Sequence, residues 1–208
     1  MTKTAPLPST RNVTRVFRTA TPEQITGALD WYLDARTVAD ALAVKSGVTL
    51  DVAAGVLAAL SPLNSWGANV NLAARFLATP GGLTAGYLRV GLDKARRIVA
   101  GHDILSVLHS DKVSAFYAGI VAAGETDAVC VDRHAYDIAV NTRHNEGDRP
   151  KLSKGRYNAV ADTYRAAAGI LSREVGMILY PAQVQSITWV TWRQRYWAAG
   201  AFDGHAEI

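Results

Sequence analysis

The sequence is poor in the residues that hold small folds together by disulfides or metals. Among 208 residues Cys130 is the one cysteine, which excludes a disulfide framework and any four-cysteine zinc or iron–sulfur site. It stands in an apolar run and is expected to be a buried thiol. The five histidines have no tight ligand spacing, so we expect no metal and no cofactor; they are His102, His109, His134, His144 and His205.

Long apolar runs and the common nucleotide or hydrolase motifs are also missing. No run approaches the roughly 20 residues that a helix needs to cross a bilayer, and the first twenty residues contain no signal-peptide hydrophobic region. We therefore expect no membrane partner and no secretory signal, and a place in the cytoplasm, or in the host cytoplasm if a phage encodes the protein. There is no P-loop, no dinucleotide-type G-x-G-x-x-G, no H-E-x-x-H and no G-x-S-x-G.

The composition nevertheless supports a sizeable core, with 49% hydrophobic and 19% charged residues, and the apolar spacing is helical throughout. No segment alternates with period two, so the predicted fold is all-α. We expect an irregular basic arm over 1–20 and a single helical domain over 21–208, with two lobes around a central cleft. Helices are predicted at 22–45, 49–60, 65–77, 91–100, 103–109, 112–123, 133–141, 153–171 and 181–198. The polar stretch 142–151 is expected to form a mobile loop.

The positive charge is unevenly distributed along the chain. The net charge is +4. Residues 1–20 contain four basic residues and no acid, and residues 151–200 contain seven basic residues against two acids. Such an excess suits the phosphate backbone of DNA, although a solvated surface would give the same pattern.

The stretch AVCVDRHAYDIAV, residues 128–140, changes abruptly from apolar residues to Asp132, Arg133 and His134. Asp132 is at once a good N-cap for the following helix and a candidate catalytic carboxylate. Lys112 precedes it by twenty residues, and a helix with a short return could bring both to one cleft. A lysine and a carboxylate together suit covalent chemistry at a sugar carbon, but such pairs are more often surface ion pairs.

Four segments over residues 57–141 resemble the helix-hairpin-helix (HhH-GPD) superfamily of DNA glycosylases, typified by endonuclease III and 8-oxoguanine DNA glycosylase. They are LAALSPLNSWGANVNLAARFL, VGLDKARRIVAG, DILSVLHSDKVSAFYAGI and VCVDRHAYDIA. The resemblance implies a two-lobed glycosylase-like fold without the iron–sulfur cluster. It also implies that Asp132 is the catalytic carboxylate and that Lys112 stands at the nucleophile position of the bifunctional members.

The resemblance further implies a pocket for a flipped-out base, lined by Asn64, Ser65, Trp66 and Asn69; taken alone, the same residues could be a helix cap. Two features depart from the family pattern. The hairpin sequence LHSDK has no glycine, and Arg133 follows the catalytic aspartate. Arg133 and His134 are therefore counted with the substrate-binding residues.

The last predicted helix alternates aromatic residues with Arg193 and Arg195; the aromatics are Trp189, Trp192, Tyr196 and Trp197. Aromatics beside arginines suit base stacking and phosphate contact, so Trp192 and Arg193 are predicted to contact DNA. The alternative is a tryptophan-rich helix packed on the core, which we favour for Trp189 and Trp197.

Three functions remain open from the sequence, and DNA is the expected partner in all of them. The first is a DNA glycosylase, with or without lyase activity, that flips out a base. The second belongs to a phage branch of the same superfamily that transfers an amino acid or polyamine onto an activated hydroxymethyl pyrimidine in DNA. The third is a DNA-binding protein that keeps the scaffold without catalysis. The sequence does not identify the base or the oligomeric state.

Overall fold

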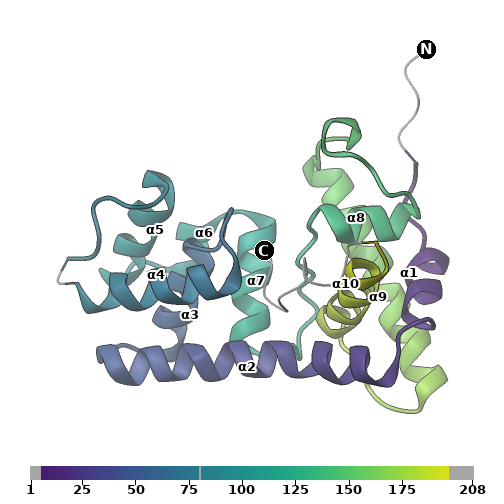
Figure 1. The fold of residues 1–208 in the computed structure, drawn as a ribbon, viewed down its shortest axis with the longest axis horizontal. Coiled ribbons are helices and arrows are strands. Elements are labelled where there is room, and N and C mark those ends of the chain that lie inside the picture. Colours follow the sequence, from purple (N-terminus) through teal and green to yellow (C-terminus); the bar gives the residue numbers. More distant parts are fainter. Residues whose placement is uncertain (1–5, 80, 197–208) are drawn as a thin grey trace. The chain divides into compact units, whose positions relative to one another are not determined.

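The computed structural model describes residues 6–79 and 81–196, and every regular element among them is helical (Figure 1). The prediction of an all-α fold is therefore confirmed for this part of the chain. The helices are α1 Thr10–Phe17, α2 Pro22–Ser46, α3 Leu50–Ala59, α4 Trp66–Ala78, α5 Arg89–Val99, α6 Ile104–Leu108, α7 Asp111–Val121, α8 Arg133–Val140, α9 Lys154–Val175 and α10 Pro181–Tyr196, with a 3-10 turn at Glu146–Asp148.

Polar caps set where the helices begin. At the start of α2, the backbone N–H of Gln24 donates to Thr21 Oγ1 at 3.3 Å, and the N–H of Thr21 donates to Gln24 Oε1 at 2.8 Å. This reciprocal pair is a capping box. Thr49 caps α3 and Ser65 caps α4 by accepting single backbone bonds, so local side-chain chemistry explains these predicted starts.

The expected irregular arm over residues 1–20 is wrong for its second half, because residues 10–17 form α1. One face of α1 is buried through Val13, Val16 and Phe17, and Asn12 Nδ2 donates to the carbonyl of Ala139 at 2.9 Å. Ser9 makes no side-chain cap bond. A helix this short is marginal by itself, so packing rather than a local signal forms α1.

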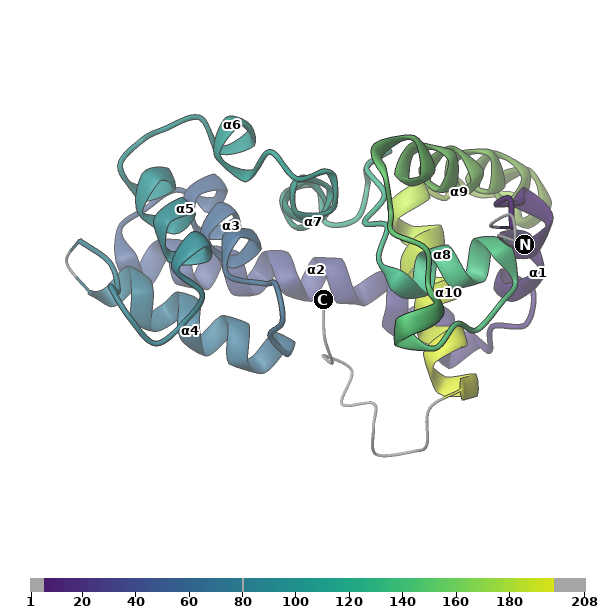
Figure 2. The same cartoon turned by 90° about the horizontal axis from the view of Figure 1, so that it is seen from above.

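The chain divides into two compact units, each with its own core. The first contains residues 6–31 and 124–196, with α1, α8, α9, α10 and the beginning of α2 gathered together (Figure 2). Its core includes Tyr136, Tyr164 and Trp192, all at most 2% exposed. The α8 helix, whose first residue follows Asp132, packs against α1, α9 and α10.

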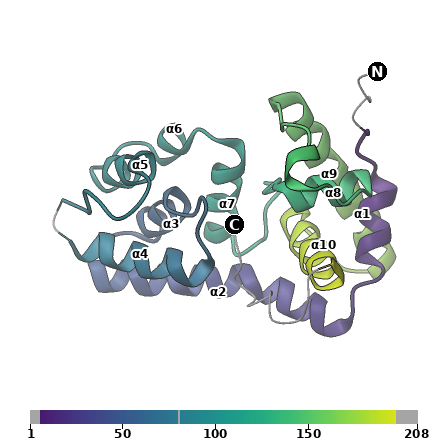
Figure 3. The same ribbon diagram turned by 45° about the horizontal axis from the view of Figure 1, so that its top comes forward.

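The second unit contains residues 32–79 and 81–123. Its centre is α3, which lies among α4, α5, α6 and α7 (Figure 3). Seven residues of α3 are buried, as expected for an apolar helix surrounded by others. On α7, an added Cβ at Gly119 would lie 2.4 Å from the ring of Tyr32, so the glycine lets α7 approach α2 closely.

Among the described helices, none is by itself long and apolar enough to span a membrane. The pair α2 and α3 meets the length and composition test only when taken together, and it bends by 112° at its break.

Candidate functional site

Asp132 follows a buried segment that is bonded to α9. Val129, Cys130 and Val131 are at most 6% exposed. The hydroxyl of Tyr157 donates to the carbonyl of Val129 at 2.7 Å and accepts from the N–H of Val131 at 3.3 Å. The backbone is thereby fixed immediately before Asp132.

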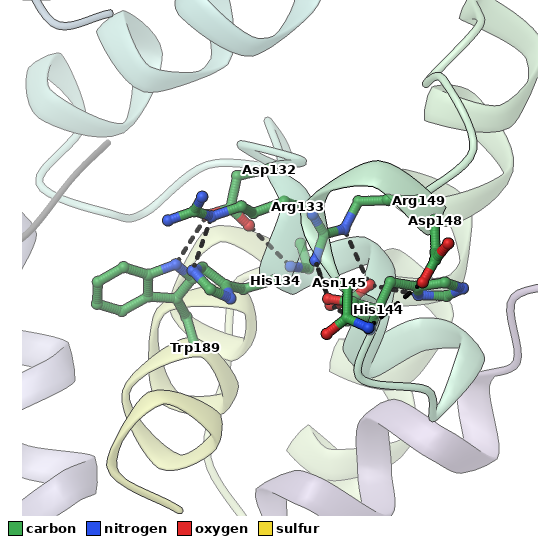
Figure 4. A network of polar contacts seen from close by, with 10 residues as sticks. Asp132, Arg133, His134, His144, Asn145, Asp148, Arg149 and Trp189 are labelled. Atoms are coloured by element: carbon green, nitrogen blue, oxygen red, sulfur yellow. Dashed lines mark hydrogen bonds and ion pairs between the residues drawn. The ribbon is translucent and has the colours of Figure 1, made fainter. Parts of the chain in front are cut away.

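The carboxylate of Asp132 is held between two helices (Figure 4). Oδ1 accepts from the N–H of Ala135 at 2.7 Å, which makes Asp132 the N-cap of α8. Oδ2 accepts from the indole Nε1 of Trp189 on α10 at 2.8 Å. The carboxylate therefore bridges α8 and α10, and the helix N-terminus favours its negative charge.

Arg133 and His134 lie beside this carboxylate. Arg133 Nε donates to His134 Nε2 at 3.3 Å (Figure 4), which requires a lone pair at Nε2 and hence a neutral imidazole. Burial lowers the pKa of His134, the charges of Arg133 and Arg193 lower it further, and the charge of Asp132 opposes them. The histidine is therefore held neutral next to the carboxylate.

Trp189 connects the group. Besides its bond to Asp132, its half-buried ring meets His134 edge-on at a centroid distance of 5.9 Å. The guanidinium of Arg193 lies 5.0 Å from the centroid of the Trp189 ring, within cation–π range. We refer to Asp132, Arg133, His134, Trp189 and Arg193 as the Asp132 cluster. The sequence indicated four of these five; Trp189 had been assigned to the core, because no local signal links residues 57 positions apart.

A second polar group lies further along α8, around Asp137, whose side chain is completely buried. Its Oδ1 accepts from His144 Nδ1 at 2.8 Å, and Arg149 donates to both oxygens at 3.1 and 2.7 Å. The stretch 142–151, which we expected to be a mobile loop, is thus tied to a buried carboxylate through His144 and Arg149. Asp137 was missed because it falls inside a helical apolar pattern.

Trp192 and Arg193 do not have the exposure predicted for DNA contact. Trp192 is 2% exposed and belongs to the core of the first unit, with Tyr196 at a ring distance of 4.5 Å. Arg193 is 4% exposed. The prediction that the Trp192 ring stacks on a base is wrong for this conformation, since the ring has no open face; Trp197 lies outside the described residues.

In the second unit, Asn64 and Ser65 both satisfy backbone groups. Asn64 Nδ2 donates to the carbonyl of Leu60 at 2.9 Å, and Ser65 Oγ accepts from the N–H of Ala68 at 3.4 Å. Both residues are half-buried. They therefore shape the turn between α3 and α4, as the alternative of a helix cap required, and a role in binding a base stays a prediction.

Trp66 and Asn69 lie deeper in the second unit. Trp66 is 6% exposed and meets Phe116 edge-on at 6.3 Å. Asn69 is 1% exposed and donates through Nδ2 to the carbonyl of Leu57 at 3.0 Å. The placement of Trp66 at the border of a pocket is wrong for this conformation, because its ring is part of the core.

Lys112 lies in the first turn of α7 and is half-buried. It belongs to the second unit and Asp132 to the first, so the prediction that they share a cleft stays a prediction. Two residues, His109 and Ser110, form the turn between α6 and α7, and His109 has a φ of 36°. Lys112 thus closely follows a two-residue turn that joins two helices and has a histidine at positive φ.

Within residues 6–79 and 81–196, no three histidine, cysteine or carboxylate side chains come together as a metal site would require. The arrangement defines an all-helical protein with a capping carboxylate bonded to a second helix and flanked by a neutral histidine and two arginines. The chain belongs to the family of unknown function DUF7178, which matches residues 2–196. No curated protein and no solved structure matches the chain.

Proposed function

We propose that the protein is a DNA glycosylase-like enzyme that acts on a flipped-out base in DNA, with Asp132 as its catalytic carboxylate. The observation that carries the proposal is the fixation of Asp132: one oxygen caps α8 and the other accepts from Trp189. A catalytic group must be held rigidly to act on one bond. The resemblance of residues 57–141 to the glycosylases and the basic composition support DNA as the partner, and we assign the protein to the cytoplasm.

In this reaction the bond between the base and C1′ of the sugar breaks, and its electron pair leaves with the base. The positive charge that develops on the sugar is stabilised by the carboxylate of Asp132, or Asp132 takes the proton of an attacking water. Burial keeps the neighbouring His134 neutral, so it adds no positive charge beside this carboxylate. Arg133, which is half-buried beside Asp132, is the cation that would meet a phosphate of the extruded nucleotide.

Lyase activity would add a covalent step through Lys112. Its neutral amine attacks C1′, the base departs, and loss of the amine proton and opening of the sugar ring give an imine. Borohydride reduces that imine to a stable protein–DNA adduct. We expect such an adduct with the wild type if the enzyme is bifunctional, none with Lys112→Ala, and slow formation with Asp132→Asn.

The decisive experiment is mass spectrometry of nucleosides from DNA incubated with the protein, comparing wild type with Asp132→Asn. Loss of a base is expected with the wild type and not with the variant. Asp162→Asn is the matched control, because Asp162 is an exposed aspartate that pairs with Arg165 at 2.7 Å on the surface of α9. Full activity of Asp132→Asn on a confirmed substrate would leave only a non-catalytic DNA-binding scaffold.

A transferase is the second candidate, favoured by Arg133 beside Asp132 and by the glycine-free turn before Lys112. Here Asp132 takes a proton from an incoming amine. The amine nitrogen forms a bond to the pyrimidine methylene carbon while the carbon–oxygen bond to pyrophosphate breaks. Arg133 or Lys112 would hold the departing pyrophosphate. The same mass spectra separate the two candidates, because transfer adds mass to a base and excision removes the base.

A further inference from the structure

The helix that replaces the expected irregular arm has two opposed faces. Val13, Val16 and Phe17 are buried on one face, whereas Arg11, Arg15 and Arg18 are exposed. The arginines are spaced by four and three residues, which aligns them on one side of a helix. At a rise of about 1.5 Å per residue, they form a row about 10 Å long.

A fourth arginine, from α10, extends the row at the C-terminal end of α1. Arg195 is exposed, and its Nη2 donates to Thr19 Oγ1 at 2.7 Å. This bond fixes the guanidinium close to the end of the helix that carries Arg18. We call Arg11, Arg15, Arg18 and Arg195 the arginine face.

Among the residues that the structure describes, one carboxylate contacts this face. Glu174 of α9 accepts from Arg18 Nε at 3.0 Å and from Arg18 Nη2 at 3.0 Å, and both side chains are substantially exposed. Residues 6–20 contain no acid. The arginine face is therefore positive over its length, and Glu174 neutralises only its Arg18 end.

We infer that the arginine face is a docking surface for the phosphate backbone of DNA, separate from the Asp132 cluster that would perform chemistry. The choice of DNA rests on the proposed function. Duplex DNA carries a negative charge for about every 1.7 Å of axis, so a 10 Å row of cations faces several phosphates. The planar guanidinium suits bidentate phosphate contacts. Because the apolar face of α1 is packed in the core, binding DNA through these arginines does not require a disordered arm to become ordered.

The test measures how binding of a duplex of about 20 base pairs depends on salt between roughly 50 and 200 mM. Each lost phosphate contact reduces the slope of log K against log salt by about 0.9. The double variant Arg11→Gln/Arg15→Gln is therefore expected to have a slope shallower by about 1.8 and weaker binding. Arg89→Gln is the matched control, since Arg89 is 93% exposed on α5 of the second unit, and it should bind like wild type.

Glu174→Gln gives the opposite prediction. It releases Arg18 from its ion pair, so DNA binding should tighten and the slope should steepen by up to about 0.9. A merely destabilising substitution would weaken binding instead, which makes this gain a specific readout.

The outcomes separate the docking surface from the proposed function. Wild-type DNA binding with an unchanged slope in the double variant overturns the docking surface and leaves the function standing. Absence of wild-type binding to any DNA overturns both. Equal dependence on Arg11 and Arg15 for binding vesicles with anionic headgroups, without any change in DNA binding, also overturns the inference, because the partner would then be a lipid surface.

Discussion

At the scale of single residues, Asp132 combines a structural and a proposed chemical role without conflict. The cap bond to Ala135 and the indole bond from Trp189 use one lone pair on each oxygen. These two bonds hold the carboxylate rigidly, with one oxygen bonded to α8 and the other to α10. The neighbouring His134 is neutral because it is buried. A side chain that is 1% exposed loses the hydration that stabilises a cation.

His134 predicts a dependence of stability on pH. Its folded-state pKa is lowered, chiefly by burial, from the ordinary value of about 6.5. Between the two values the unfolded chain binds more protons than the folded chain. The stability that neutral His134 contributes to the folded state is therefore fully present above about pH 6.5. It is lost as the pH falls towards the folded-state pKa. The free energy of unfolding should decrease from about pH 7.5 to about pH 5.5.

Urea denaturation at both pH values checks this prediction. His134→Gln should flatten the change, since glutamine keeps an acceptor for Arg133 but does not titrate. The exposed His102, whose Nδ1 lies 3.0 Å from the carbonyl of Arg97, provides the control: His102→Gln should retain the wild-type pH dependence. An equally steep change in His134→Gln would show that another group causes it.

At the scale of elements, the stretch after α8 shows how one buried charge orders a polar segment. Nothing in the composition of residues 142–150 suggests order. The segment nevertheless returns to α8, because the buried carboxylate of Asp137 has to be paired and both His144 and Arg149 satisfy it. The two basic side chains are themselves mostly buried.

Asp137→Asn should release this segment. Removing one partner of a buried ion pair typically costs about 3–5 kcal/mol, because the other charge is left uncompensated. We expect a loss of stability in this range and faster tryptic cleavage after Arg143 or Lys151. Asp162→Asn, which removes an exposed carboxylate on α9, should leave both properties unchanged. Cleavage at the wild-type rate in Asp137→Asn would mean that the ion pair does not hold the segment.

At the scale of the whole molecule, two units with separate cores share the long helix α2. Each core is built around helices that are apolar on more than one face, α10 in the first unit and α3 in the second. The effect of a substitution in one core on stability can therefore be measured by hydrogen exchange of the backbone amides in that unit.

Trp66→Ala is expected to destabilise the second unit by about 3–5 kcal/mol, the usual cost of deleting a buried aromatic ring. Hydrogen exchange of the amides in α3, α4 and α7 measures it, because these helices belong to the unit whose core loses the ring. Trp66→Phe, which keeps an aromatic ring against Phe116, should cost considerably less. A loss below about 1 kcal/mol in Trp66→Ala would restore Trp66 to the pocket-lining role expected from the sequence.

The sequence alone determined the helical class and most helix boundaries, since these depend on apolar periodicity and on caps such as Thr21, Thr49, Ser65 and Asp132, which act within four residues. It also indicated Asp132, because an N-cap after an apolar run is a local pattern. The tertiary structure decided what depends on distant partners. These features are the formation of α1, the burial of Trp66 and Trp192, the indole bond to Asp132, and the anchoring of residues 142–150 by Asp137. The reason is that burial and pairing of a side chain are set by segments tens of residues away, which no local pattern encodes.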